Sequence, residues 1–213
     1  MTFADWGLLA LTCFAGASSP GPSLAMLIRS VLSDGRLAGM VFGLAHGAGV
    51  LLYAGAVAAG LGAALLISPV IFTVLQVAGA IFLLFIATQM IRGGLSAPAD
   101  IETPARVPQS PRSLGRHGVD GFLIVFLNPK IAAFFLAIFS QFLVEGQDLA
   151  TRTGMTMLAW LIDTGWYLLA AVIIAFPPVL SRLERHQQRI ELGIGCVLLL
   201  IGLSLALRIL AMP

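Results

Sequence analysis

Long apolar runs alternate with short polar connections along the whole chain. Six runs can be delimited, at roughly 6–28, 38–62, 70–91, 121–143, 155–176 and 192–210. At 1.5 Å per residue, each run is long enough to cross a hydrocarbon core of about 30 Å. A segment in lipid must satisfy its own backbone hydrogen bonds, so each run has to be helical. The pattern predicts an all-α, polytopic membrane protein with six transmembrane helices.

Composition supports a single transmembrane domain over residues 1–213. The chain is 59% hydrophobic and 10% charged, with a mean hydropathy of +0.99, whereas soluble domains carry about 25% charged residues. The net charge of +2 gives no reason to expect a nucleic-acid partner. Cys13 and Cys196 lie in apolar runs and fit no metal spacing. We therefore expect no metal, no cofactor and no enzymatic activity.

The connections divide the chain into two halves. Ser68-Pro69 predicts a tight turn between the second and third runs, and residues 93–118 form one long proline-rich segment. We expect a first repeat over about 1–92, a flexible cytoplasmic loop over about 93–118, and a second repeat over about 119–213. Ala15-Gly16-Ala17 resembles a signal-peptidase site, but no basic residue precedes the first run, so we interpret this run as a retained span.

Basic residues predict the orientation of the spans. The connections after the first, third and fifth runs hold Arg29, Arg36, Arg92, Arg106, Arg112, Arg116, Arg182, Arg185 and Arg189. The opposite side holds only Arg152 and Arg208. Because basic connections stay on the cytoplasmic side, both termini are predicted to lie outside the cytoplasm.

Prolines interrupt the first and fourth runs near their midpoints. The two interruptions read Ser19-Pro20-Gly21-Pro22-Ser23 and Asn128-Pro129-Lys130. An internal proline removes a backbone hydrogen bond and clashes with the preceding turn. Ser19 and Asn128 each precede a proline as N-cap residues do, so each interruption is predicted to begin a new half-helix.

The two interruptions occupy corresponding positions in halves of opposite orientation. Three helices precede the fourth run, so the second half is inverted relative to the first. Discontinuous helices at the midplane of two inverted three-helix repeats are typical of secondary transporters, whose substrate site they form. We therefore predict substrate-binding residues in both interruptions: Pro20, Gly21, Pro22, Ser23, Asn128, Pro129 and Lys130. The alternative is two simple kinks without a site.

Lys130 and Asp163 are ionisable residues near the middle of their runs. Each costs on the order of 3 kcal/mol at the centre of a membrane helix, so neither should face lipid unpaired. We predict that they share a polar cavity, either paired directly or bridged by water and substrate, and we add Asp163 to the substrate-binding set. The alternative is an ion pair that only fixes the register of two helices.

Two features of the second run remain open at this stage. His46 has a side chain that titrates near neutral pH, which makes it a candidate for proton coupling together with Asp163. A hydrogen-bonded structural histidine is the alternative. Gly35, Gly39, Gly43 and Gly47 recur every four residues and favour close helix packing, with a sliding surface as the alternative.

The chain resembles the LysE/RhtB family of lysine exporters and homoserine/threonine resistance transporters. The likeness rests on Pro20-Gly21-Pro22-Ser23, Asp34-Gly35-Arg36-Leu37-Ala38-Gly39, Gly43-Leu44-Ala45-His46-Gly47, Ser68-Pro69, Gly121-Phe122-Leu123, Leu127-Asn128-Pro129-Lys130, Phe139-Ser140-Gln141-Phe142, Asp163 and Tyr167. The motifs keep their order and spacing over nearly the whole chain. The resemblance implies a bacterial inner-membrane exporter of amino acids or related small metabolites, driven by the proton gradient and assembled as a homodimer.

Two other functions are compatible with a polytopic helical chain. A membrane redox carrier would use Cys13 and Cys196, but neither thiol has an activating neighbour in the sequence. A passive channel would show a ring of like charges or a filter-like repeat, and neither is visible. A proton-coupled exporter therefore remains the leading hypothesis.

Overall fold

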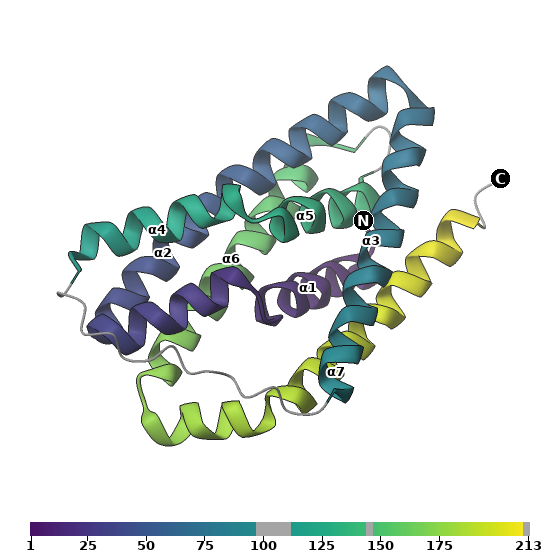
Figure 1. Ribbon diagram of the computed structural model, residues 1–213. Coiled ribbons are helices and arrows are strands. Elements are labelled where there is room, and N and C mark those ends of the chain that lie inside the picture. Colours follow the sequence, from purple (N-terminus) through teal and green to yellow (C-terminus); the bar gives the residue numbers. More distant parts are fainter. Residues whose placement is uncertain (97–111, 144–146, 211–213) are drawn as a thin grey trace.

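The computed structural model describes residues 1–96, 112–143 and 147–210, and all the regular structure in this part of the chain is helical. The helices are α1 (Phe3–Ser18), α2 (Pro22–Ile67), α3 (Pro69–Leu95), α4 (Leu114–Leu127), α5 (Pro129–Phe142), α6 (Leu149–Ile174) and α7 (Pro177–Leu210) (Figure 1). The predicted all-α class is therefore confirmed, and so is the turn at Ser68, which caps α3 ahead of Pro69.

Several helices are long and apolar enough to cross a membrane. In the described part of the chain these are Pro22–Gly62, Val70–Leu95, Leu149–Ile174 and Gln188–Leu207. α4 and α5 meet at a 58° bend and would add a fifth span if they are taken together. α1 is apolar but has only 16 residues. The chain is thus a multi-pass membrane protein by length and hydropathy.

The second helix is longer than one membrane crossing. α2 has 46 residues, and at 1.5 Å per residue it spans roughly twice the ~30 Å hydrocarbon core. Gly35 interrupts it with φ 84° and ψ 179°, a left-handed conformation that glycine adopts without the penalty a Cβ would impose. The chain therefore changes direction at Gly35, and α2 supplies the end of the first predicted span and all of the second.

Both proline interruptions are real breaks, but their caps differ from the prediction at the first one. Asn128 is the N-cap of α5, and its side chain accepts the Lys130 N–H, as the sequence predicts. The prediction that Ser19 caps the following helix is wrong. Ser19 is the C-cap of α1, its hydroxyl donates to the carbonyl of Gly16, and α2 begins only at Pro22. The second proline, and not the first, occupies the first helical position.

The connections are shorter than the sequence predicts. Helix extends into both ends of the expected 93–118 loop, because α3 runs to Leu95 and α4 starts at Leu114. The remainder of that loop, with its prolines and Arg106, falls largely outside the described residues. The connection between the fifth and sixth runs is also helical, since α7 begins at Pro177.

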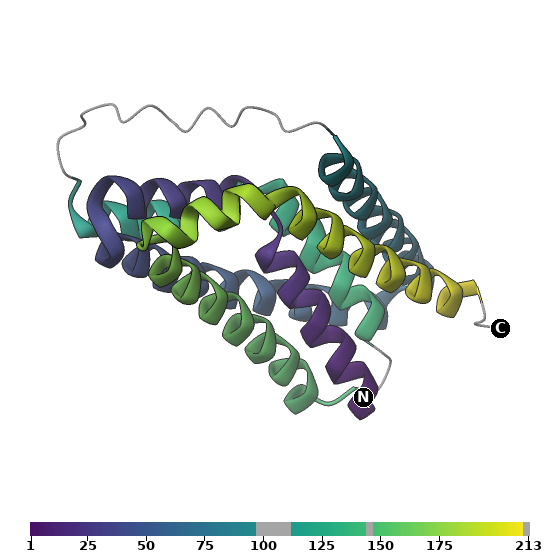
Figure 2. The same ribbon diagram turned by 90° about the horizontal axis from the view of Figure 1, so that it is seen from below.

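Small residues allow α2 to pack tightly between α4 and α6, while α3 lies beside α7 (Figures 1 and 2). A Cβ on Gly43 would lie 3.2 Å from Cβ of Tyr167, and one on Gly47 would overlap Thr164, both in α6. On the other side, a Cβ on Gly121 of α4 would overlap the backbone of Phe42. The glycine face of α2 is therefore a packing surface.

This packing predicts that adding one methyl group at Gly47 destabilises the bundle. In Gly47→Ala the new Cβ meets Thr164, and such overpacking costs about 1–3 kcal/mol, or a fall of roughly 2–12 °C in melting temperature. Gly165→Ala in α6 is the matched control, because a Cβ there has nothing within 4 Å. Thermal unfolding of both variants in the same detergent compares them. Equal melting temperatures would contradict the close α2–α6 contact.

Candidate functional site

A cavity of about 50 Å³, lined by charged, polar and apolar side chains, lies where the two interrupted helices approach each other. This is room for several water molecules. Helices α1, α2, α5 and α6 and both interruptions contribute to its wall. The lining residues are Cys13, Gly16, Ala17, Ser19, Gly21, Ser23, Leu24, His46, Val50, Asn128, Lys130, Ile131, Phe134, Phe135, Ala159, Asp163 and Tyr167. Five of the predicted substrate-binding residues and both proton-coupling candidates are in this set, whereas Pro20, Pro22 and Pro129 are not.

Hydrogen bonds connect the two interruptions directly. The Lys130 ammonium donates to the Ser19 hydroxyl at 2.5 Å and to the Pro20 carbonyl at 2.9 Å. The Asn128 amide donates to the Ser23 hydroxyl at 3.1 Å, and both of these side chains are buried. Polar groups of each interruption are therefore hydrogen-bonded by the other.

The position of Lys130 also suits its charge. Its ammonium lies at the C-terminal end of α1, where the helix dipole concentrates partial negative charge. Pro20, whose carbonyl it binds, is not part of a helix. A cation there offsets the free carbonyls that the break leaves in the interior.

Asp163 pairs with His46. The His46 Nδ1 lies 2.9 Å from the Asp163 Oδ2, and the histidine is 1% exposed. Because a carboxylate only accepts, Nδ1 carries the proton in this contact. The other ring nitrogen, Nε2, is buried and has no hydrogen-bond partner among the described residues. The pair thus presents an unused basic nitrogen in the interior of the protein.

Tyr167 connects this pair to the first interruption. Its ring stacks on the His46 imidazole with centroids 4.1 Å apart, and it shares a hydrogen bond with Ser23. Ser23 in turn accepts from Asn128. A continuous set of contacts therefore runs from the carboxylate of α6 to both breaks.

The structure brings Lys130 and Asp163 to the same cavity without a direct contact. Among the described residues, Lys130 bonds to Ser19 and Pro20, and the ion-pair partner of Asp163 is His46. The direct Lys130–Asp163 pair, one of the two arrangements expected from the sequence, is therefore not formed. The shared cavity leaves bridging by water or substrate as the remaining arrangement.

Several cavity residues are not indicated by the hydrophobic pattern, although the family resemblance includes Tyr167. Tyr167 and Cys13 lie in apolar runs in which aromatic and thiol side chains usually serve packing. Both cysteines are free, with Cys13 buried in the cavity wall and Cys196 exposed on α7. Trp166 packs edge-to-face on Phe14. The family resemblance singles out Tyr167, and the tertiary packing shows why: Tyr167 reaches the cavity and its neighbour Trp166 does not.

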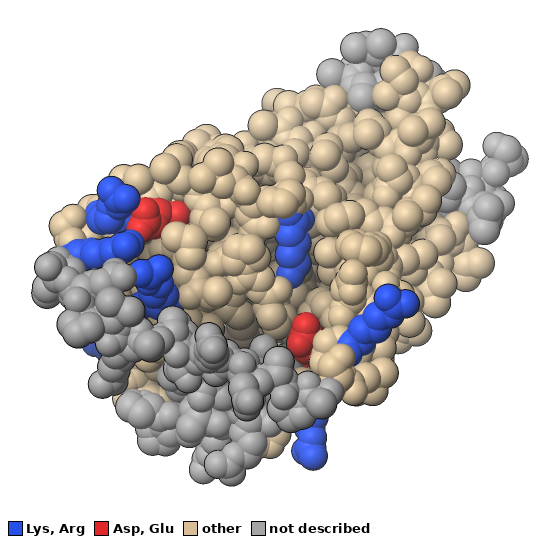
Figure 3. Space-filling view, in the orientation of Figure 1, with Lys and Arg blue, Asp and Glu red and all other residues tan. Residues whose placement is uncertain are grey.

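Some basic and acidic side chains lie near the middle of the face shown in Figure 3 and toward its lower right. The main cluster of charges lies at its left, where α4 begins beside the kink of α2. Arg112 and Arg116 both pair with Asp120 there, at 3.2 and 3.5 Å. A mostly uncharged surface covers the rest of this face, as expected for helices in contact with lipid.

An apolar helical bundle whose small cavity holds charged side chains at two broken helices has the architecture of a membrane transport protein. The chain belongs to the LysE type translocator family, whose family model matches residues 14–208. It is similar to the threonine efflux protein of Escherichia coli (strain K12), with 26% identity over 92% of this chain and 95% of the relative. It also shares 26% identity with the homoserine/homoserine lactone efflux protein of Salmonella typhi, over 97% of this chain and 98% of the relative. No solved structure matches the chain.

The contact between the two interruptions predicts energetic coupling between Lys130 and Ser19. Lys130→Met and Ser19→Ala should each lower the melting temperature in detergent, and the double variant should lose less than the sum. Residues in direct contact couple by about 0.5–3 kcal/mol. Ser204→Ala is the control, because that hydroxyl bonds within α7, and its effect should add to that of Lys130→Met. Additive losses for Lys130 and Ser19 would mean that the contact contributes nothing.

Proposed function

We propose that this protein is a proton-coupled secondary exporter of amino acids or closely related small metabolites, with its substrate site in the central cavity. The observation that carries the proposal is the convergence of both interruptions and of Asp163 on one cavity. Family membership supports the transport class. The names of the relatives, which refer to threonine and homoserine efflux, support amino acids as the substrates.

The two ends of a zwitterionic substrate find opposite charges in this cavity. Its carboxylate would meet Lys130 and the N-terminal turns of α2 and α5, where helix dipoles place partial positive charge. Its ammonium group would meet Asp163 or free carbonyls of the first interruption. The neighbouring wall is apolar, with Val50, Phe134 and Ala159, and suits a short side chain.

Substrate entry would require the helices to separate. The cavity of about 50 Å³ has room for water, and an amino acid is larger than the few molecules that would fill it. Rearrangement of one half against the other around a fixed site is the usual mechanism of inverted-repeat transporters. The present arrangement would then be a constricted state of the transport cycle.

The His46–Asp163 pair would couple this movement to the proton gradient. A proton taken up at the unpartnered Nε2 would leave the imidazolium paired with the carboxylate. A substrate ammonium that approaches Asp163 would compete with that imidazolium. Proton and substrate would then bind in alternation, which is the requirement for proton-driven export.

The helix neighbours support two inverted repeats with six spans. Inverted repeats make the first span equivalent to the fourth, the second to the fifth and the third to the sixth. Every contact between two spans should then have a counterpart between the two equivalent spans. The contact of α3 with α5 then corresponds to that of α7 with α1, and the contact of α2 with α4 to that of α6 with α1. All of these occur. Termini outside the cytoplasm of a bacterial inner membrane, and assembly as a homodimer, complete the proposal.

Export can be tested with purified protein in proteoliposomes, with a panel of labelled amino acids and an imposed pH gradient. Asp163→Asn should abolish gradient-driven transport, because the amide cannot hold a proton-dependent charge. Asp148→Asn is the matched control: Asp148 caps α6 outside the cavity, and asparagine is an equally good N-cap. It should transport like the unmodified protein.

Two outcomes would contradict the proposal. Unimpaired transport by Asp163→Asn would remove this carboxylate from the mechanism. Downhill flux that ignores the pH gradient would favour a passive channel. A Cys13→Ser, Cys196→Ser double variant tests the redox alternative, because a thiol-based carrier would lose all activity while an exporter would keep it.

A further inference from the structure

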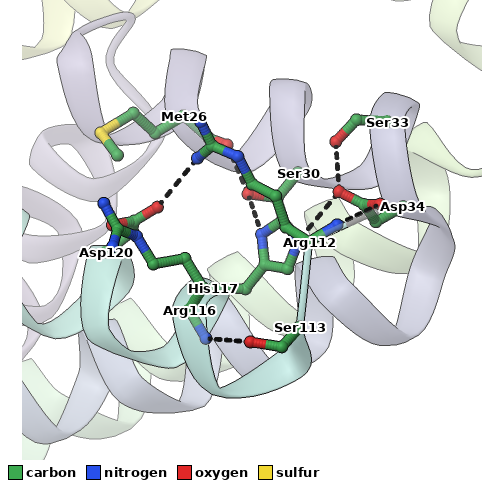
Figure 4. A network of polar contacts seen from close by, with 9 residues as sticks. All are labelled: Met26, Ser30, Ser33, Asp34, Arg112, Ser113, Arg116, His117 and Asp120. Carbon is green, nitrogen blue, oxygen red and sulfur yellow. Dashed lines mark hydrogen bonds and ion pairs between the residues drawn. The ribbon is translucent and has the colours of Figure 1, made fainter. Parts of the chain in front are cut away.

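A second histidine, His117, is buried between α2 and α4 at the end of the bundle that carries the arginines (Figure 4). It is 2% exposed and lies outside the cavity. Its Nδ1 lies 3.1 Å from the Ser30 hydroxyl, and its Nε2 lies 3.0 Å from the Asp34 carboxylate. Both partners come from α2, 87 and 83 positions away in the sequence. Neither the cavity nor the proposed transport step uses this cluster.

The hydrogen-bond partners of His117 allow two proton arrangements. The Ser30 hydroxyl lies 2.9 Å from the Met26 carbonyl and 3.1 Å from the His117 Nδ1, so it can donate its single proton to either. The Asp34 carboxylate has no proton to donate and only accepts. When the Ser30 proton is on the Met26 carbonyl, both ring nitrogens of His117 are donors and the ring is an imidazolium cation. When the Ser30 hydroxyl turns to donate to Nδ1, the ring is neutral and donates from Nε2 to Asp34.

The hydrogen bonds of Asp34 favour the ionised form of its carboxyl group. It also accepts from the Ser33 hydroxyl at 2.8 Å and from the Arg112 backbone N–H at 3.2 Å. The Ser33 hydrogen bond lowers the pKa of the Asp34 carboxyl, and those from Arg112 and His117 act in the same direction. The carboxylate therefore stays ionised near neutral pH, and the charge state of the contact depends on His117.

Other charges near His117 come from both helices and are largely compensated. Arg112 and Arg116, whose guanidinium groups would repel the imidazolium, both pair with Asp120. On α2, Arg29 and Arg36 are exposed, so solvent screens them. Asp34 is the charged group in direct contact with the ring, so its ion pair with the imidazolium is the main electrostatic interaction of His117.

The cluster joins the two helices that carry the interruptions. Ser30 and Asp34 lie in the part of α2 between the first break and the kink at Gly35. His117 lies in α4, which ends at the second break. Movement of α4 away from α2 at this end would have to break both contacts of the histidine. Histidine is the side chain that changes charge near neutral pH, so the strength of this connection depends on proton concentration on its own side of the membrane.

We propose that His117 is a protonated latch that fastens α4 to α2, and that loss of its proton weakens the latch. A neutral ring can still donate from Nε2 to Asp34 and accept from the Ser30 hydroxyl at Nδ1, but its contact with Asp34 is then no longer an ion pair. The latch is closed while the ring is charged and weakens as the pH rises. Alkalinisation of the compartment on the arginine-bearing side would therefore loosen this end of the bundle, independently of any event in the cavity.

The charge on the ring can be measured directly. The unmodified protein, labelled with ¹⁵N-histidine in lipid bilayers, contains three histidines, and solid-state NMR distinguishes an imidazolium from either neutral tautomer. We expect one cationic ring at pH 7 that is absent from the His117→Gln variant. His46→Gln and His186→Gln should each keep it, which completes the assignment even if His117→Gln folds poorly. A neutral His117 ring at pH 7 would overturn the proposal.

The latch itself is tested by the pH dependence of stability. In the same detergent, His117→Gln should melt roughly 2–4 °C below the unmodified protein at pH 6, the shift expected for about 1 kcal/mol. The difference should be smaller at pH 9, because a neutral ring keeps its hydrogen bonds but forms no ion pair with Asp34. His186→Gln should follow the profile of the unmodified protein. A charged ring whose removal lowers the melting temperature equally at both pH values would show a structural contact and no latch.

Discussion

The structure depends on how backbone groups freed by proline are satisfied inside an apolar environment. Two breaks in one bundle leave N–H and C=O groups without helical partners, and each such group costs several kcal/mol if it is left unsatisfied in lipid. In this protein the two breaks lie side by side. Lys130, from the second break, binds the Pro20 carbonyl of the first. Asn128 caps α5 and donates to the Ser23 hydroxyl at the start of α2. The same groups that solve a structural problem supply polar side chains to the wall of the cavity.

Histidine–carboxylate pairs occur at two levels of the bundle, and each joins helices distant in the sequence. His46 and Asp163 bind α2 to α6 in the cavity, while His117 and Asp34 bind α4 to α2 at the charged end. The two pairs differ in how many ring nitrogens of the histidine have a hydrogen-bond partner. Among the described residues one His46 nitrogen has no hydrogen-bond partner, which leaves a place for a proton, whereas both His117 nitrogens have partners.

Close helix approach makes both pairs feasible. Glycines at positions 43 and 47 bring α2 against α6, and Gly121 brings α4 against the backbone of α2. Helices in membranes gain little from hydrophobic exclusion between them, so packing of small residues and buried polar contacts provide their association. At these close crossings a short side chain such as aspartate can reach an imidazole on the neighbouring helix.

Much of this organisation follows from the sequence by itself. The length of the apolar runs determines helices, because lipid forbids other backbone arrangements. The prolines determine the two breaks, since the missing N–H and the steric clash are properties of the residue. The cost of charge in a membrane predicts that Lys130 and Asp163 face the interior. These are local constraints, and the described helices follow them with shifts of a few residues at the ends.

Only the tertiary structure decided which polar groups are partners. Ser19 precedes a proline like an N-cap, yet it caps the end of α1 and binds Lys130, because the start of α2 at Pro22 and the approach of α5 determine what it contacts. Asp163 takes His46 and not Lys130, and His117 meets Asp34 across 83 residues. Such pairings depend on the rotation and spacing of the helices, which are set by glycine packing. Hydrophobic periodicity in a single sequence does not predict them.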